Sequence, residues 1–241
     1  FHRLDAFFVG ILLITQFVFS LHWAKTLPKW LPWIYGFLTL LVAFQGFLGA
    51  LTVLKLLPSL IVIAHLAIAF TLVAIMSAVT QQLLNPGKSI FPPWIRSFGL
   101  LSLLSVMAQS LLGSRVATSW AAHRCLDFGD SCNLLVLHRL SAFPVCFLVM
   151  SFVIISFSQR DIFLDHWPYF LTITFLVISQ IFLGVFSIQL GMSEPSLVVG
   201  HQLVACLLVA VISALNFKGS KINGSSQSLF ITESTLETCN G

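Results

Sequence analysis

Seven long apolar stretches, separated by short polar segments, dominate the sequence. Each has the roughly 20 residues that a helix needs to cross the hydrocarbon core of a bilayer. The apolar residues run continuously and do not alternate as they would in a membrane β-barrel, and backbone groups inside a bilayer must bond within the protein. We therefore predict seven transmembrane helices, near residues 3–23, 33–54, 59–83, 97–119, 136–158, 168–190 and 196–217.

The composition agrees with this pattern and defines the class of protein. The chain of 241 residues is 58% hydrophobic and only 8% charged, whereas about 25% of the residues of a soluble domain are charged. Its net charge of +4 does not indicate a nucleic-acid partner, because the cations lie in loops between apolar segments, where they orient a membrane protein. We expect an all-α, multi-pass integral membrane protein in contact with the lipid bilayer.

One six-residue motif occurs twice and relates the two parts of the chain. His-Arg-Leu-Asp-Ala-Phe at residues 2–7 returns as His-Arg-Leu-Ser-Ala-Phe at residues 138–143, 136 residues later. A second histidine follows each copy after 63 residues, His65 in the first case and His201 in the second. Two further motifs recur in the same order, and together these repeats indicate two copies of one structural unit. Residues 45–49 return at 180–184, and residues 58–60 return at 195–197.

The repeat also predicts the domain organisation. The last three predicted helices are second copies of the first three, so the helix at 97–119 and the loop at 120–135 lack a counterpart in the first copy. We expect two four-helix bundles with seven of the eight helices present, the first helix and first outer loop being lost by an N-terminal truncation. The expected divisions are an N-terminal bundle at 1–83, a connecting loop at 84–96, a C-terminal bundle at 97–217 and a disordered tail at 218–241.

The positive charges predict the orientation of the chain in the membrane. The connections after the first, third and fifth predicted helices, together with the C-terminal tail, hold more Lys and Arg than the loops on the opposite side. Cytoplasmic loops carry the excess of positive charge in membrane proteins. We therefore place the C-terminus in the cytoplasm and the start of the chain outside.

Four histidines lie near the outer ends of the predicted helices and form two matched pairs. His2 and His65 lie on helices that run in the same direction, so both belong to the outer half of one bundle, and His138 and His201 do so in the other. Two neutral imidazoles from facing helices suit the two axial positions of a haem iron. Carboxylates are too scarce for a di-metal carboxylate site, and a proton relay would need more acids than Asp5.

Other polar residues of the helices keep two interpretations each. Arg3, Arg115 and Arg139, at the outer helix ends, either pair with haem propionates or lie among lipid headgroups. Glutamine and glycine four residues apart either pack helices closely, with the glutamine bonded across the bundle, or leave room for a flat ligand. These two interpretations apply to Gln45 with Gly49 and to Gln180 with Gly184. The helix at 97–119 contains a third such pair, Gln109 and Gly113, which is given no interpretation.

Two cysteines, Cys125 and Cys132, lie in the outer loop at 120–135. Seven residues apart, on the side of the membrane where thiols are oxidised, they predict a disulfide that closes a small loop. A zinc site shared with His123 is the alternative. His166 is assigned to a loop and is given no special role.

These residues together resemble the haem A synthases, the CtaA/Cox15 family. The resemblance extends from residue 1 to about residue 217, and although no single motif is specific, the four histidines, their order and the cysteine loop are specific as a set. The motifs that carry it are His2-Arg3-Leu4, Gln45 to Leu51, Ala64-His65-Leu66, the loop with Cys125 and Cys132, His138-Arg139 and Gly200-His201.

The resemblance implies an enzyme of the bacterial inner membrane that acts on a haem substrate. Its C-terminal bundle would hold haem b between His138 and His201. Its N-terminal bundle would receive haem O at the catalytic residues His2 and His65. The implied reaction oxidises a methyl group of haem O to a formyl group by successive hydroxylations, giving haem A for terminal oxidases. The implied partners are a haem O synthase and an electron acceptor.

One departure from the family bears on activity. Members carry a catalytic glutamate just ahead of the first histidine and a cysteine pair in the first outer loop. Neither is present in this sequence. We therefore expect the chain to bind haem, and we expect catalytic turnover to depend on the glutamate that this sequence does not contain. A bis-histidine cytochrome that transfers electrons, for instance from quinol, and a haem transporter are the alternatives. Unequal halves favour the synthase over the cytochrome, and Asp5 against Ser141 is one such difference.

Overall fold

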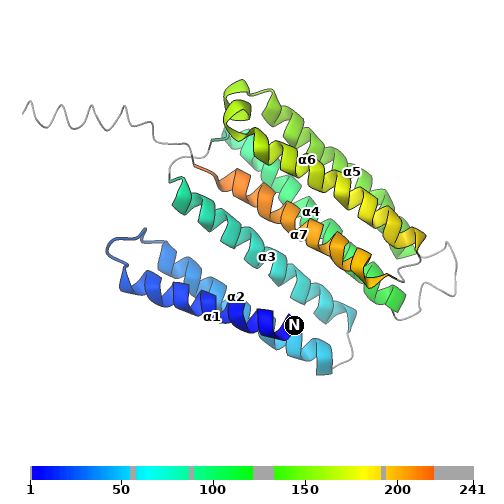
Figure 1. Cartoon of the computed structure of the whole chain (residues 1–241), viewed down its shortest axis with the longest axis horizontal. Helices are drawn as coiled ribbons and strands as arrows, with labels where there is room; N and C mark the ends of the chain where they lie inside the picture. The colour runs from blue at the N-terminus through cyan, green and yellow to red at the C-terminus, as the bar shows by residue number, and fades with distance from the viewer. Residues whose placement is uncertain (1, 55–57, 87–89, 122–132, 191–193, 220–241) are drawn as a thin grey trace, which may run out of the picture.

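The structure, a computed structural model, describes residues 2–54, 58–86, 90–121, 133–190 and 194–219 (Figure 1). All of the long elements in these residues are helices, and each helix runs antiparallel to the one before it in the chain. The helices are α1 (His2–His22), α2 (Leu31–Leu54), α3 (Ser59–Leu84), α4 (Pro93–Ala121), α5 (Asn133–Phe157), α6 (Arg160–Gln189) and α7 (Pro195–Phe217).

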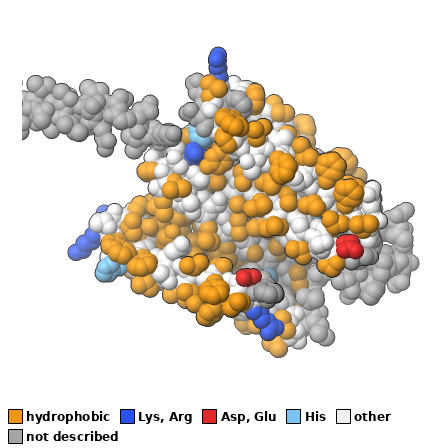
Figure 2. Space-filling model, in the orientation of Figure 1, with side chains coloured by type: hydrophobic (Ala, Val, Ile, Leu, Met, Phe, Trp, Pro, Cys, Tyr) orange, Lys and Arg blue, Asp and Glu red, His pale blue; other side chains and the backbone are white. Residues whose placement is uncertain are grey.

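The seven helices of the described part are each long and apolar enough to cross a membrane. Large hydrophobic side chains point outward along them; Trp33 is 82% exposed and Leu54 is 77% exposed. Figure 2 shows hydrophobic side chains over most of the visible face and charged side chains at its margins. An outward apolar surface is stable only in lipid, so the predicted all-α, multi-pass membrane fold is confirmed.

The prediction for the sixth helix was wrong at its start. Pro168 was expected near the first residue of that helix, but α6 begins eight residues earlier, at Arg160, and continues through the proline. The preceding segment mixes charged and apolar residues and so gives no long apolar run. His166, assigned to a loop, therefore lies on α6, where it is only 7% exposed and its Nδ1 lies 2.9 Å from the carbonyl oxygen of Ile162.

The last four helices form a closed ring. α4 packs against α5, α5 against α6, α6 against α7, and α7 against α4, so α5 and α7 lie diagonally across the ring. Its core contains large buried side chains such as Phe152, Ile173 and Ile212. α3 packs against both α7 and α4, and α2 and α1 follow beside it. A smaller core of Leu13, Leu38 and Leu72 holds these first three helices together.

Two serine hydroxyls join α3 to α7 in a reciprocal way. Ser77 Oγ donates to the carbonyl oxygen of Ala210 over 2.7 Å, and Ser213 Oγ donates to that of Ala74 over 2.7 Å. The two donors are 136 residues apart, and so are the two acceptors, which is the interval of the sequence repeat. The two helices thus meet through equivalent positions, as in a two-fold contact between identical subunits.

Candidate functional site

His138 and His201 lie on opposite helices of the ring. His138 is in the second turn of α5, and His201 follows the start of α7 at Pro195 by six residues, about 9 Å of helix. Both helices begin at the same end of the molecule (Figure 1). The two imidazoles are half-buried and close enough to interact electrostatically. The structure thus brings the second predicted histidine pair together.

A glycine of the neighbouring helix contacts each of these rings. A Cβ added to Gly113 of α4 would lie 2.9 Å from His138 Cε1, and one added to Gly184 of α6 would lie 3.1 Å from His201 Cε1. Carbon atoms in contact normally lie about 3.5–4.0 Å apart. Only glycine therefore lets each imidazole lie directly against the next helix without displacing the ring.

A glutamine one turn before each glycine reaches the same imidazole. The Gln109 amide nitrogen lies 3.1 Å from His138 Nδ1 and donates to the His138 carbonyl oxygen over 2.7 Å. The Gln180 amide nitrogen lies 3.3 Å from His201 Nε2. Gln180 is thus bonded to a neighbouring helix, as one of the two interpretations of Gln180 expected, and Gln109, for which no interpretation was given, is bonded in the same way. The histidine as partner of each glutamine was not anticipated.

The two glutamines differ in how they are held. Ser141 Oγ donates to Gln109 Oε1 over 2.8 Å. Gln180 Oε1 and His201 Nδ1 are both buried, and neither has a hydrogen-bond partner in the described part of the chain. Both polar ends of the Gln109 amide therefore have hydrogen-bond partners, whereas Gln180 Oε1 and His201 Nδ1 can each form one more hydrogen bond.

The first half repeats part of this arrangement. His65 of α3 faces Gly49 of α2, where an added Cβ would lie 3.4 Å from His65 Cε1. This is the counterpart of the contact between His201 and Gly184. His2 begins α1, but its side chain is outside the described part, so its pairing with His65 stays a prediction.

The remaining predicted site residues are exposed or lie outside the described residues. Arg115, near the end of α4, and Arg139, next to His138 on α5, both have exposed side chains. Their predicted contact with propionates stays a prediction. Cys125 and Cys132 fall in residues 122–132, which are outside the described ranges, so the predicted disulfide is not tested.

The donor set decides which group the ring can bind. Among the described residues, no three His, Cys, Asp or Glu side chains gather as a metal ion bound by protein alone would need. One imidazole from each of two diagonal helices instead matches a cofactor that supplies its own equatorial ligands, as a porphyrin does. Glycines on the other two helices leave the rings uncrowded. The residues present fit a haem with His138 and His201 as axial ligands.

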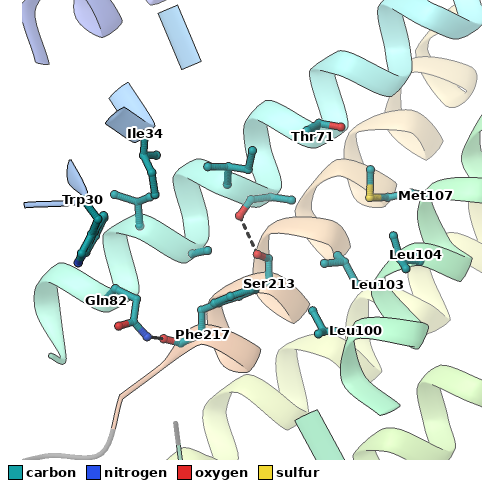
Figure 3. Close-up of a pocket in the computed structure, with 14 residues that line it drawn as sticks. Trp30, Ile34, Thr71, Gln82, Leu100, Leu103, Leu104, Met107, Ser213 and Phe217 are labelled. Atoms are coloured by element: carbon teal, nitrogen blue, oxygen red, sulfur yellow. Dashed lines mark hydrogen bonds between the residues drawn. The ribbon is translucent and has the colours of Figure 1, made fainter. Parts of the chain in front are cut away.

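A separate groove lies between the two halves. It has a volume of about 510 Å³ and lies between α2, α3, α4 and α7 (Figure 3). Ser213 and Gln82 are among its few polar residues, and Gln82 donates its amide N–H to the carbonyl oxygen of Phe217. The groove contains none of the four predicted histidine ligands, so it is distinct from the candidate site.

The fold and the site together define a class: a polytopic membrane protein with one histidine on each of two diagonal helices of a four-helix ring, each in contact with a glycine of a neighbouring helix. Comparison with known families is more specific. Residues 1–213 match the COX15-CtaA family of cytochrome oxidase assembly proteins, and the chain belongs to that family. No curated protein is significantly similar to it. The resemblance seen in the sequence is therefore confirmed, and a role in cytochrome oxidase assembly follows from membership.

Proposed function

We propose that the protein is a haem A synthase, which oxidises a methyl group of haem O to a formyl group for use in terminal oxidases. The family match supports the general role in oxidase assembly. The single structural observation that carries the proposal is the diagonal pair His138 and His201, each resting against a glycine of the adjacent helix. That arrangement suits a resident haem, which the reaction needs because side chains alone do not oxidise a methyl group.

In this proposal the two halves have different tasks. The C-terminal ring holds haem b through His138 and His201, and a haem bound there supplies one-electron redox chemistry. The N-terminal helices bind the substrate haem O through His2 and His65. Gly49 helps to position the His65 ring in the same way as Gly184 positions His201. Arg115 and Arg139 are proposed to meet haem propionates as charge-assisted pairs.

The surroundings of the site are part of the proposal. Seven apolar helices place the chain in a membrane, and we propose the inner membrane of a bacterium, with the C-terminus in the cytoplasm according to the distribution of Lys and Arg. The proposed partners are a haem O synthase, which makes the substrate, and an electron acceptor.

The proposal is tested by extracting and separating haems from membranes that contain this protein and a source of haem O. Haem A or its hydroxylated precursor should appear only when the protein is present, and His65→Ala should abolish the product. Bound haem b with unchanged haem O in a well-folded sample would reject the synthase and support a bis-histidine cytochrome that only transfers electrons.

A further inference from the structure

The groove between the two halves runs along α3 for about half the thickness of a bilayer. Its lining on α3 extends from Thr71 to Gln82, eleven residues further on, which corresponds to about 16 Å of helix. The hydrocarbon core of a bilayer is about 30 Å thick. Gln82 lies two residues before the end of α3 at Leu84. The groove therefore begins near one membrane surface and ends near the middle of the bilayer.

The inner part of the groove suits a hydrocarbon chain. Ala74 and Ala78 lie one turn apart on α3 and contribute only methyl groups, which leaves space between the larger side chains of α2 and α4. The two hydroxyl groups of the lining are already bonded. Thr71 Oγ1 donates to the carbonyl oxygen of Ala67, and Ser213 Oγ donates to that of Ala74. An apolar chain can thus lie there without leaving a polar group unpaired.

The groove has a polar end at the membrane surface. Figure 3 shows Trp30, Gln82 and Phe217 at one end of it, and Thr71 and Met107 at the other. Tryptophan is typical of the membrane interface. Gln82 donates to the carbonyl oxygen of Phe217, the last residue of α7. The groove therefore matches an amphiphile whose polar head lies at the surface and whose chain points inward.

Arg96 brings a positive charge to this polar end. Its guanidinium carbon lies 5.0 Å from the centre of the Phe217 ring, which lines the groove. Its Nε is buried and has no hydrogen-bond partner in the part of the chain that the structure describes. The acidic residues with described side chains, Asp5 at the start of α1 and Glu194 just before α7, lie at the other end of the molecule. A partly buried cation without a counter-ion favours an anionic ligand.

We propose that this groove binds one anionic phospholipid, with an acyl chain along α3 and the phosphate at Arg96. Basic pockets between membrane helices are typical sites for anionic lipid head groups. A transmembrane helix, from a partner or from a second copy of the chain, would extend across both leaflets, whereas the groove lies within one. The site contains none of the four histidines, so the inference does not depend on the proposed haem chemistry.

The head-group test uses the purified full chain in non-ionic detergent and measures bound lipid by native mass spectrometry. Phosphatidylglycerol and phosphatidylcholine with identical acyl chains separate the effect of charge from that of the chain. One phosphatidylglycerol should be retained per chain in preference to phosphatidylcholine. Arg96→Gln should weaken this binding about fivefold, the usual contribution of one cation near an anionic membrane surface. Arg160→Gln is the matched control and should leave it unchanged, because Arg160 begins α6 with an exposed side chain outside the groove.

The acyl-chain test fills the hollow on α3. Ala78→Phe should abolish retention of both lipids, and the smaller change Ala78→Leu should weaken it. Ala43→Phe is the matched control and should retain lipid normally, because Ala43 lies on α2 with an exposed side chain outside the groove. Circular dichroism checks that each variant keeps its helical content. Ala78→Leu and Arg96→Gln keep the test decisive if Ala78→Phe does not fold.

Four results would overturn the inference. Two are equal retention of phosphatidylglycerol and phosphatidylcholine, and equal effects of Arg96→Gln and Arg160→Gln. The third is displacement of the lipid by inorganic phosphate, which would assign Arg96 to a free anion. The fourth is unchanged lipid binding in folded Ala78 variants; loss of a dimer in these variants would then assign the groove to a second copy of the chain.

Discussion

Replacing Gly113 by alanine tests how the ring holds His138. The new Cβ would lie 2.9 Å from His138 Cε1 and 3.5 Å from both ring nitrogens. Contacting carbon atoms rest about 3.5–4.0 Å apart, so the imidazole has to move by about 0.6 Å or more. A binding group must stay within about 0.5 Å of its productive position. We therefore expect haem b to be lost at least about tenfold faster from Gly113→Ala than from the unchanged protein.

The assay follows transfer of haem b from the purified protein to excess apomyoglobin. Gly184→Ala, with an added Cβ at 3.1 Å from His201 Cε1, requires a shift of about 0.4 Å and should have a smaller effect of the same kind. Gly46→Ala is the matched control, because a Cβ there meets nothing within 4 Å. The imidazole is the mobile end of a side chain, so all three variants should fold. Equal haem loss from Gly113→Ala and Gly46→Ala would refute the reasoning.

Two other predictions concern the contact between the halves and the substrate histidine. Ser77→Ala and Ser213→Ala should each lower the free energy of unfolding in micelles by about 0.6 kcal/mol, the average for hydrogen bonds between membrane helices. The control Thr80→Ala, whose hydroxyl bonds its own helix, should lower it less. Equal effects of the three variants would contradict a stabilising contact of these serines between α3 and α7. His65→Ala should keep the haem b spectrum while haem A formation stops, and loss of all bound haem would contradict separate sites.

The span pattern could be predicted because apolar length alone determines which segments cross a bilayer. The bounds of α3 and α7 differ by only a residue from those expected. The start of α6 could not be predicted in this way. Its first eight residues include Arg160, Asp161, Asp165 and His166 among apolar side chains, and hydropathy does not detect a helical extension that contains so many charged and polar groups.

The histidine pair could be predicted because the repeat gives each half two histidines 63 residues apart, so that His138 and His201 correspond to His2 and His65. Their contacts with Gln109 and Gly113, or with Gly184, depend on how each helix is rotated about its axis. Helices that are apolar on all sides give little periodic signal for that rotation. Ser141 was noted only as the counterpart of Asp5, and its bond to Gln109 became apparent from the packing of α4 against α5.

We propose that the ring of α4 to α7 binds one haem through His138 and His201. Electron paramagnetic resonance of the purified ferric protein loaded with haem b tests it most directly, because two imidazole ligands give a characteristic low-spin signal. We expect this signal in the unchanged protein and its loss in both His138→Ala and His201→Ala. Persistence of the bis-histidine signal in both single variants would contradict the assignment of the ligands.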